Sequence, residues 1–137
     1  MYLLDTNVVS ELRRSRPHPA VLEWIRSVPS ERLHLSAVTV GEIQGGIEKT
    51  RAHDSAKASA LEAWLGQVME AYPILALDGV TFREWGRLMH RQSAALSQDA
   101  MIAAVARIHG LTVVTRNVRD FEHFGVEILD PFVAPAS

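Results

Sequence analysis

Four acidic residues stand where a strand-like run or a short turn leads into a helix-like segment: Asp5, Glu42, Asp99 and Asp120. Asp5 follows an apolar run at residues 2–4, and Asp120 comes one short turn after the run at residues 113–115. In an open parallel α/β sheet, ligands bind outside the carboxyl ends of the strands. Carboxylates that converge there repel one another unless a divalent cation neutralises them. The pattern therefore indicates a metal site, and with it catalytic chemistry.

Each acid also has a structural explanation when it is taken alone. Asp5 could cap the helix that follows it, and the helix dipole favours Asp99 in a first turn. Asp120 comes three residues after Asn117, as in a capping box, and Glu42 could face solvent on an amphipathic helix. Helix caps are commoner than metal ligands, so the four acids gain weight only as a group.

The elements that must position these acids alternate between strand-like and helical patterns, which is the signature of parallel βαβ units. We expect five strands, at residues 2–5, 33–35, 73–77, 112–115 and 126–129. Helices are expected at 8–14 (capped by Thr6 or Asn7), 20–28, 37–50, after residue 54, after a capping Asp78, and at 98–109, with a short turn at 117–121. Residues 1–137 are predicted to form a single α/β domain around a mostly five-stranded parallel sheet.

The predicted helix at 98–109 is apolar on nearly every side, so we expect it to be buried. Ser97 is expected to cap its start, and Gly110 to cap its end in the left-handed conformation. Asp99 would then begin an element that runs under the domain.

The predicted helix at 37–50, capped by Ser36, carries Glu42 on the same face as Gly45 and Gly46. Each glycine costs a helix about 1 kcal/mol of stability relative to alanine. The pair indicates that a ligand or another backbone approaches this face closely. Packing of a neighbouring helix is the structural alternative.

The composition is that of a globular protein, with 137 residues, 47% hydrophobic and 22% charged. The absence of Cys excludes a disulfide framework and a thiolate zinc site. A net charge of -2 argues against tight, sequence-independent binding of duplex nucleic acid, but not against a nuclease whose acidic ligands lower the count. The longest apolar run, at 100–106, is too short to span a bilayer. We expect a cytoplasmic protein, since Asp5 falls where a signal peptide needs a basic or apolar residue.

Four segments resemble, in order and at the usual spacing, the four motifs of the PIN-domain nucleases. They are Leu3 to Leu12, Ser36 to Ile43, Gln98 to Ala104 and Thr115 to Phe121. The resemblance covers nearly the whole chain and, within the family, points to the VapC-like toxins of bacterial toxin–antitoxin pairs. It implies a three-layer fold in which helices flank a five-stranded parallel sheet.

The resemblance also implies roles for particular residues. Asp5, Glu42 and Asp99 would be the principal carboxylates, and Asp120 a fourth that more often acts through water. The acids would bind Mg²⁺ or Mn²⁺, and water would cleave an RNA phosphodiester bond. Polar support would come from Thr6, Asn7, Thr115 and Asn117.

Two positions depart from the family pattern. Val105 stands where many relatives have Thr, which we interpret as neutral packing. Gln98 stands beside Asp99 where some relatives have another acid, so the number of metal ions stays open. The resemblance further implies a homodimer, with a higher toxin–antitoxin assembly as the alternative, and a small antitoxin that wraps the toxin.

The chemistry of the residues is compatible with these implications. Hard oxygen ligands without Cys select Mg²⁺ or Mn²⁺ over zinc. The basic residues are nearly all Arg, which suits bidentate recognition of phosphate. The candidate RNA contacts are Arg83, Arg87 and Arg91 on one helix flank, and Arg116. A solvated helix face is the alternative for the first three.

Rival functions fit the residues less well. A phosphoryl-receiver domain needs an acid pair after the first strand, where only Asp5 stands, and a Lys after a late strand. A mononucleotide-binding module needs a glycine-rich phosphate loop with its Lys, which is missing. A PIN fold acting only through a partner surface would not need all four acids. Aromatic residues suited either to such a surface or to the core are Trp24, Trp64 and Tyr72.

Overall fold

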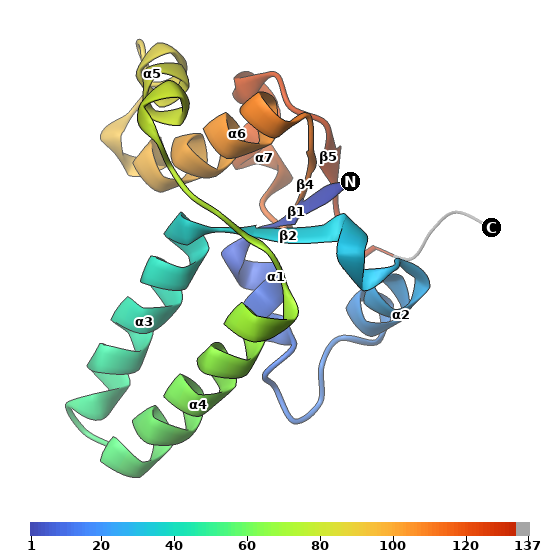
Figure 1. The fold of residues 1–137 in the computed structure, drawn as a ribbon, viewed down its shortest axis with the longest axis vertical. Helices are drawn as coiled ribbons and strands as arrows, with labels where there is room; N and C mark the ends of the chain where they lie inside the picture. Colours follow the sequence, from blue (N-terminus) through green and yellow to red (C-terminus); the bar gives the residue numbers. More distant parts are fainter. Residues whose placement is uncertain (134–137) are drawn as a thin grey trace.

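The computed structural model describes residues 1–133, which form a central sheet of five parallel strands (Figure 1). The strands are β1 (Tyr2–Leu4), β2 (Leu33–Ser36), β3 (Ile74–Leu75), β4 (Thr112–Val114) and β5 (Ile128–Leu129), in the spatial order β3-β2-β1-β4-β5. The predicted five-stranded parallel sheet is confirmed. The chain lays down β2 and β3 on one side of β1 and returns to lay down β4 and β5 on the other. The topological switch point therefore lies between β1 and β4, which is where an open α/β sheet binds its ligands.

Helices cover both faces of the sheet, which gives the three layers that the resemblance implies (Figure 1). The helices are α1 (Thr6–Glu11), α2 (Pro19–Ser27), α3 (Ala37–Arg51), α4 (Ser55–Ala71), α5 (Gly79–Leu88), α6 (Ser97–His109) and α7 (Val118–Phe121). In the figure α1 to α4 lie below the sheet and α5 to α7 above it, and α3 and α4 form a hairpin that projects away from the strands.

Two hydrophobic cores result, one on each face of the sheet. Successive strand residues point to opposite faces of the sheet. Leu4 and Val114 therefore enter the core between the sheet and α1 to α4, while Leu3 and Val113 enter the core between the sheet and α6 and α7. All four side chains are fully buried. Val105 also lies in the second core, in agreement with the packing role predicted for it.

The two edge strands are shorter than predicted. The expected strands at 73–77 and 126–129 pair only over Ile74–Leu75 and Ile128–Leu129. Each edge strand has one neighbour, and it can pair only as far as that neighbour extends. Neighbouring β2 ends at Ser36, whose side chain caps α3 by accepting from the backbone N–H of Thr39.

Two predicted caps are wrong. Asp5, rather than Thr6 or Asn7, caps α1, because its Oδ1 accepts from the backbone N–H of Thr6 at 2.8 Å. Ser97 lies inside α6 and caps nothing. A short 3-10 turn at Ala94–Leu96, capped by Ser93, leads straight into that helix and takes over the capping.

Other predicted helix ends are confirmed. Asp78 caps α5 through the backbone N–H of Thr81, and Gly110 ends α6 with a φ of 66°. Helix α6 is buried through its middle, as predicted, whereas its last turn is exposed, with Ile108 41% accessible. None of the helices at residues 1–133 is long and apolar enough to cross a membrane.

Candidate active site

Asp5 lies at the switch point, at the carboxyl end of β1, and its side chain is only 4% exposed. The hydroxyl of Thr115, at the end of β4, donates to Asp5 Oδ2 at 2.8 Å. The side-chain amide of Asn7 donates to the same oxygen at 3.1 Å. With the capping bond from Thr6, three donors fix this carboxylate in one orientation.

The loop after β4 is tied to the same cluster. Asn7 Oδ1 accepts from the backbone N–H of Arg116 at 3.2 Å, and Thr115 Oγ1 accepts from that of Asn117 at 2.9 Å. Three of the predicted supporting residues, Thr6, Asn7 and Thr115, therefore contact Asp5 directly. Asn117 contributes through its backbone, because its side chain caps no helix.

Glu42, Asp99 and Asp120 are half-buried, and their charges act on Asp5 or on one another. Burial and the charge of Asp5 raise the pKa of Glu42, while the nearby Thr6 hydroxyl lowers it. Burial, followed by the charges of Asp5, Asp120 and Glu42, raises the pKa of Asp99 to about 6. The pKa of Asp5 is also raised, by burial first, although its hydrogen bonds oppose the shift.

The four acids therefore lie near enough to act on one another electrostatically, and no basic side chain of the described residues pairs with them. Within residues 1–133, none of the ion pairs includes any of these four carboxylates. A group of like charges in which Asp5, Glu42 and Asp99 have raised pKa values is typical of functional sites.

The donor set suits a hard divalent cation, since it consists of carboxylate oxygens with hydroxyl and amide groups around them. In the described part of the chain, however, no three acidic or histidine side chains already stand close enough to hold an ion. Asp5 is fixed, so binding would require the half-buried acids to turn toward it. Their partial exposure leaves room for that movement.

Thr39 is a residue at this site that sequence reasoning missed. It is fully buried, and its hydroxyl accepts a 3.1 Å hydrogen bond from that of Thr6. The bond joins the first turn of α1 to the first turn of α3, and so fixes Asp5 relative to Glu42. A polar residue one turn before Glu42 was the only signal in the sequence.

The glycine face of α3 is open. A Cβ atom added at Gly45 or Gly46 would meet nothing within 4 Å, so no helix of the described chain packs there. The packing explanation is therefore wrong within residues 1–133. This face instead borders a hollow of about 570 Å³ that reaches Glu42 on one side and Gln98 on the other. Binding of a ligand on this face stays a prediction.

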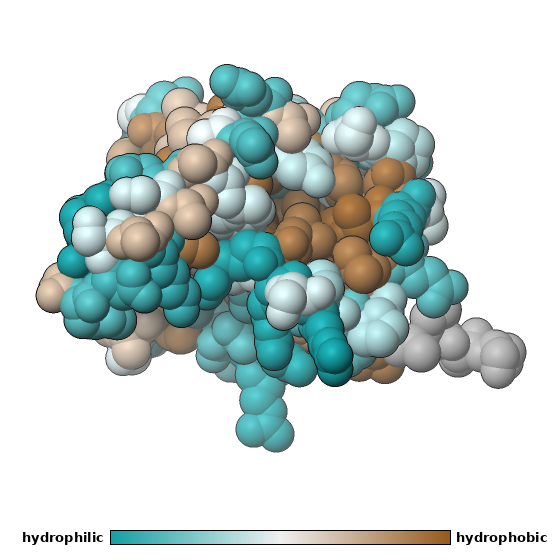
Figure 2. Space-filling model, turned by 90° about the horizontal axis from the view of Figure 1, so that it is seen from below, coloured by the Kyte–Doolittle hydropathy of each residue, from teal (hydrophilic) through white to brown (hydrophobic). Residues whose placement is uncertain are grey.

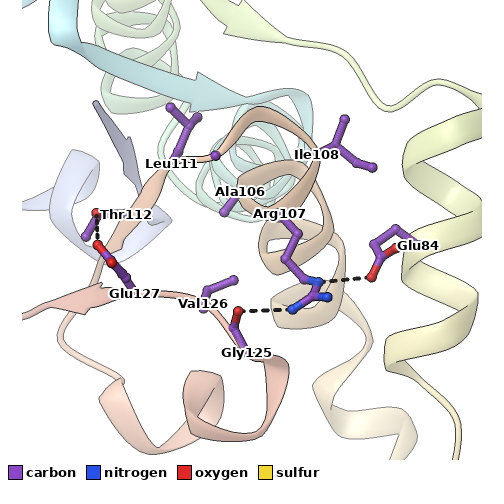
Figure 3. A pocket seen from close by; sticks show the side chains of 10 residues that line it. Glu84, Ala106, Arg107, Ile108, Leu111, Thr112, Gly125, Val126 and Glu127 are labelled. Atoms are coloured by element: carbon purple, nitrogen blue, oxygen red, sulfur yellow. Dashed lines mark hydrogen bonds and ion pairs between the residues drawn. The ribbon is translucent and has the colours of Figure 1, made fainter.

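The predicted arginine stripe does not form one helix flank. Helix α5 ends at Leu88, and Arg91 follows it with a φ of 65°, outside the helix. Arg87 pairs with Glu84 at 3.1 Å. Glu84 also pairs with Arg107, which lines a pocket of about 400 Å³ (Figure 3). This pocket lies at the start of β4, whereas Asp5 lies at the opposite, carboxyl end of the strands.

The polar side chains that line this pocket form hydrogen bonds with one another or with main-chain carbonyl groups. Figure 3 shows Arg107 reaching Glu84 and the carbonyl of Gly125, and Thr112 reaching Glu127. Of the four candidate RNA contacts, Arg116 alone adjoins the acidic cluster, through its hydrogen bond to Asn7.

Comparison with known proteins agrees with this geometry. A sequence model of the PIN domain matches residues 2–127. The chain belongs to the PIN domain family. It is 32% identical to toxin FitB of Neisseria gonorrhoeae, covering 96% of this chain and 99% of FitB. It is 34% identical to the VapC ribonuclease Y4jK of Sinorhizobium fredii, covering 96% and 98%. The crystal structure of FitAcB from N. gonorrhoeae superimposes with a TM-score of 0.86 at 32% identity, covering 96% and 99%.

The hydrogen bond from Thr115 to Asp5 predicts a stability effect. Thr115→Val keeps the shape of this buried side chain but removes the hydroxyl that a buried carboxylate needs. We expect a loss of about 2 kcal/mol in the free energy of unfolding, since hydrogen bonds to charged groups contribute about 1.5–3 kcal/mol. Urea unfolding of Thr115→Val and of Thr115→Ser, which retains the hydroxyl, tests this. A valine variant as stable as the serine variant would contradict the role of the bond.

Proposed function

We propose that this PIN-domain protein is a metal-dependent endoribonuclease that acts as the toxin of a toxin–antitoxin pair. The observation that carries the proposal is the convergence of Asp5, Glu42, Asp99 and Asp120 at the switch point of the sheet, with raised pKa values at the first three. The names of two relatives, a VapC ribonuclease and a toxin, support an RNA-cleaving toxin.

In this proposal the four carboxylates hold Mg²⁺ or Mn²⁺. Asp5 is the fixed ligand, because Thr6, Asn7 and Thr115 already determine its orientation. Glu42, Asp99 and Asp120 are the adjustable ligands. A bound cation would lower the pKa of a water molecule and stabilise the negative charge that develops on the phosphate.

Asp99 carries the proton that competes with the cation. Its pKa of about 6 means that the metal-free protein keeps this carboxyl largely protonated below that pH. Metal ligands must be deprotonated, so cation binding releases this proton. We therefore expect cleavage to rise with pH between about 5 and 7.

Cleavage of mixed-sequence RNA by the purified chain tests the proposal. We expect cleavage with Mn²⁺ or Mg²⁺, none in EDTA, and loss of toxicity on expression for Asp5→Asn. Glu84→Gln is the matched control, because it removes a carboxylate from the far pocket and should cleave normally. Failure to cleave any class of RNA with either metal, or undiminished cleavage in EDTA, would overturn the proposal.

We further propose a small antitoxin as partner, a homodimer or a higher toxin–antitoxin assembly, and a cytoplasmic location. The name of the relative toxin FitB supports the antitoxin. Figure 2 shows the face of the molecule toward which α3 and α4 project, and on it hydrophobic side chains gather in a hollow. Trp24, Trp64 and Tyr72 are half-buried against the core on this side of the sheet, so core packing accounts for part of their surface. Co-purification with mass identification of a bound small protein tests the proposed antitoxin partner.

A further inference from the structure

Phe132 lies beyond residues 2–127, the stretch that matches the family, yet its ring contacts the loop beside the acidic cluster. The guanidinium carbon of Arg116 lies 4.2 Å from the ring centroid, within the range of a cation–π interaction. On another side, His18 meets the ring edge-on at 5.4 Å between centroids. The backbone N–H of Phe132 donates a 2.9 Å hydrogen bond to Asp130 Oδ1, which fixes the main chain at this position.

Arg116 is linked to Asp5 by hydrogen bonds through the side chain of Asn7. Its backbone N–H donates to Asn7 Oδ1, and the amide of Asn7 donates to Asp5. Its side chain borders a hollow of about 390 Å³ whose other lining includes Arg119 and Asp120. The guanidinium of Arg116 at this position lies beside the carboxylates and does not take the place of the proposed metal ion.

The ring of Phe132 also explains why Arg116 does not neutralise the acids. Asp120 and Asp130 line the same hollow, yet within residues 1–133 Arg116 forms no ion pair with either. An exposed Arg free to rotate would be drawn toward the acids and would compete with a metal ion. Stacking on Phe132 keeps the guanidinium out of the cluster and reduces the rotamer entropy lost when it binds a phosphate.

We propose that Phe132 is a positioning residue that holds Arg116 to bind an RNA phosphate next to the one being cleaved. This inference rests on the proposed ribonuclease function. A guanidinium presents a planar set of donors suited to phosphate oxygens. Because such a contact does not depend on base identity, RNA of any sequence should detect it.

RNA binding by ring-less variants tests the proposal. In an Asp99→Asn background that blocks cleavage, a fluorescein-labelled, mixed-sequence single-stranded RNA is titrated at several salt concentrations. Arg116→Met should reduce the slope of log affinity against log salt by about 0.7, the value for one phosphate contact on a single strand. Phe132→Leu should weaken binding about threefold, while Phe132→Tyr should retain it. Adding Phe132→Leu to Arg116→Met should weaken binding no further.

A second readout separates positioning from folding. In the cleaving protein, Phe132→Leu should raise KM and leave kcat nearly unchanged, because Arg116 contributes to binding the strand. The thermal midpoint should stay near that of the wild type, since Leu fills most of the space of this half-buried ring. If Phe132→Leu unfolds at a lower temperature, Phe132→Met repeats the test with another ring-less side chain.

The possible outcomes discriminate between the two proposals. Wild-type affinity in Phe132→Leu, or additive losses in the double variant, would overturn the positioning role and leave the ribonuclease proposal intact. RNA binding that depends on Arg116 and Phe132 without any metal-dependent cleavage would support the positioning contact and overturn the ribonuclease. Absence of RNA binding by the wild-type chain would overturn both.

Discussion

Asp99→Asn should make the metal-free protein more stable at neutral pH while reducing RNA cleavage about a thousandfold. The two effects have one cause, a carboxylate that is half-buried beside the uncompensated negative charges of Asp5, Asp120 and Glu42. Asparagine nearly matches the shape of the aspartate and cannot ionise. In the absence of metal it therefore removes the cost of burying a charged carboxylate and the repulsion from the neighbouring acids. It also removes one ligand from the proposed cation site.

The stability gain should depend on pH in a defined direction. In the folded protein the pKa of Asp99 is about 6, above its ordinary value of 3.8. Between these values the folded state binds more protons than the unfolded state, so the stability of the wild type falls as pH rises through this window. Above about pH 6 the loss is complete, and there Asp99→Asn should gain about 1 kcal/mol, reduced from the full shift because the carboxylate is half-exposed. Near pH 4 the two proteins should be about equally stable.

Urea unfolding in EDTA at both pH values, together with cleavage of mixed-sequence RNA, measures the two effects. A thousandfold loss of cleavage corresponds to about 4 kcal/mol of transition-state stabilisation. Asp78→Asn is the control, because Asp78 only caps α5 and should leave cleavage unchanged. An Asp99→Asn variant that loses stability at neutral pH, or that cleaves as the wild type does, would contradict this explanation.

Adding Mn²⁺ or Mg²⁺ should stabilise the wild-type chain against thermal unfolding. A ligand present at a hundredfold excess over its Kd contributes about 2.7 kcal/mol, which corresponds to several degrees in Tm for a domain of this size. The stabilisation should shrink as pH falls below about 6, because the proton on Asp99 then competes with the cation.

Two variants make this thermal shift specific. Glu84→Gln should keep the whole shift, since Glu84 lies in the pocket at the start of β4, at the other end of the strands from Asp5. Asp99→Asn should lose most of it. A wild-type Tm that does not respond to either metal, or a response that is the same at pH 5 and pH 8, would argue against a carboxylate cation site.

Local patterns were enough to predict the frame of this site. Strand-like patterns at residues 2–5 and 112–115 predict parallel strands, and the carboxyl ends of parallel strands lie at the same end of the sheet. The meeting of Asp5 with Thr115 follows from that topology. Asp78 and Gly110 were predictable as helix ends because capping depends on neighbouring residues.

Contacts between distant segments, and the choice between competing local signals, were not predictable in this way. Ser97 is a suitable cap by type, but the turn capped by Ser93 precedes it. The bond of Thr39 to Thr6 spans α1 and α3, and the stacking of Phe132 on Arg116 depends on where the chain goes after β5. A helix pattern also continued to Arg91 although the helix ends at Leu88, because arginine has no local signal for a positive φ.

The central claim is that Asp5, Glu42, Asp99 and Asp120 together hold a divalent cation. Anomalous X-ray diffraction from crystals grown with Mn²⁺ at a pH above 7 tests it most directly, because the scattering locates the metal itself. We predict a manganese peak between Asp5 and at least two of the other three carboxylates, with the side chain of Asp99 turned toward it. A crystal with no peak at this edge of the sheet, or with manganese bound only near Glu84 and Glu127, would contradict the claim.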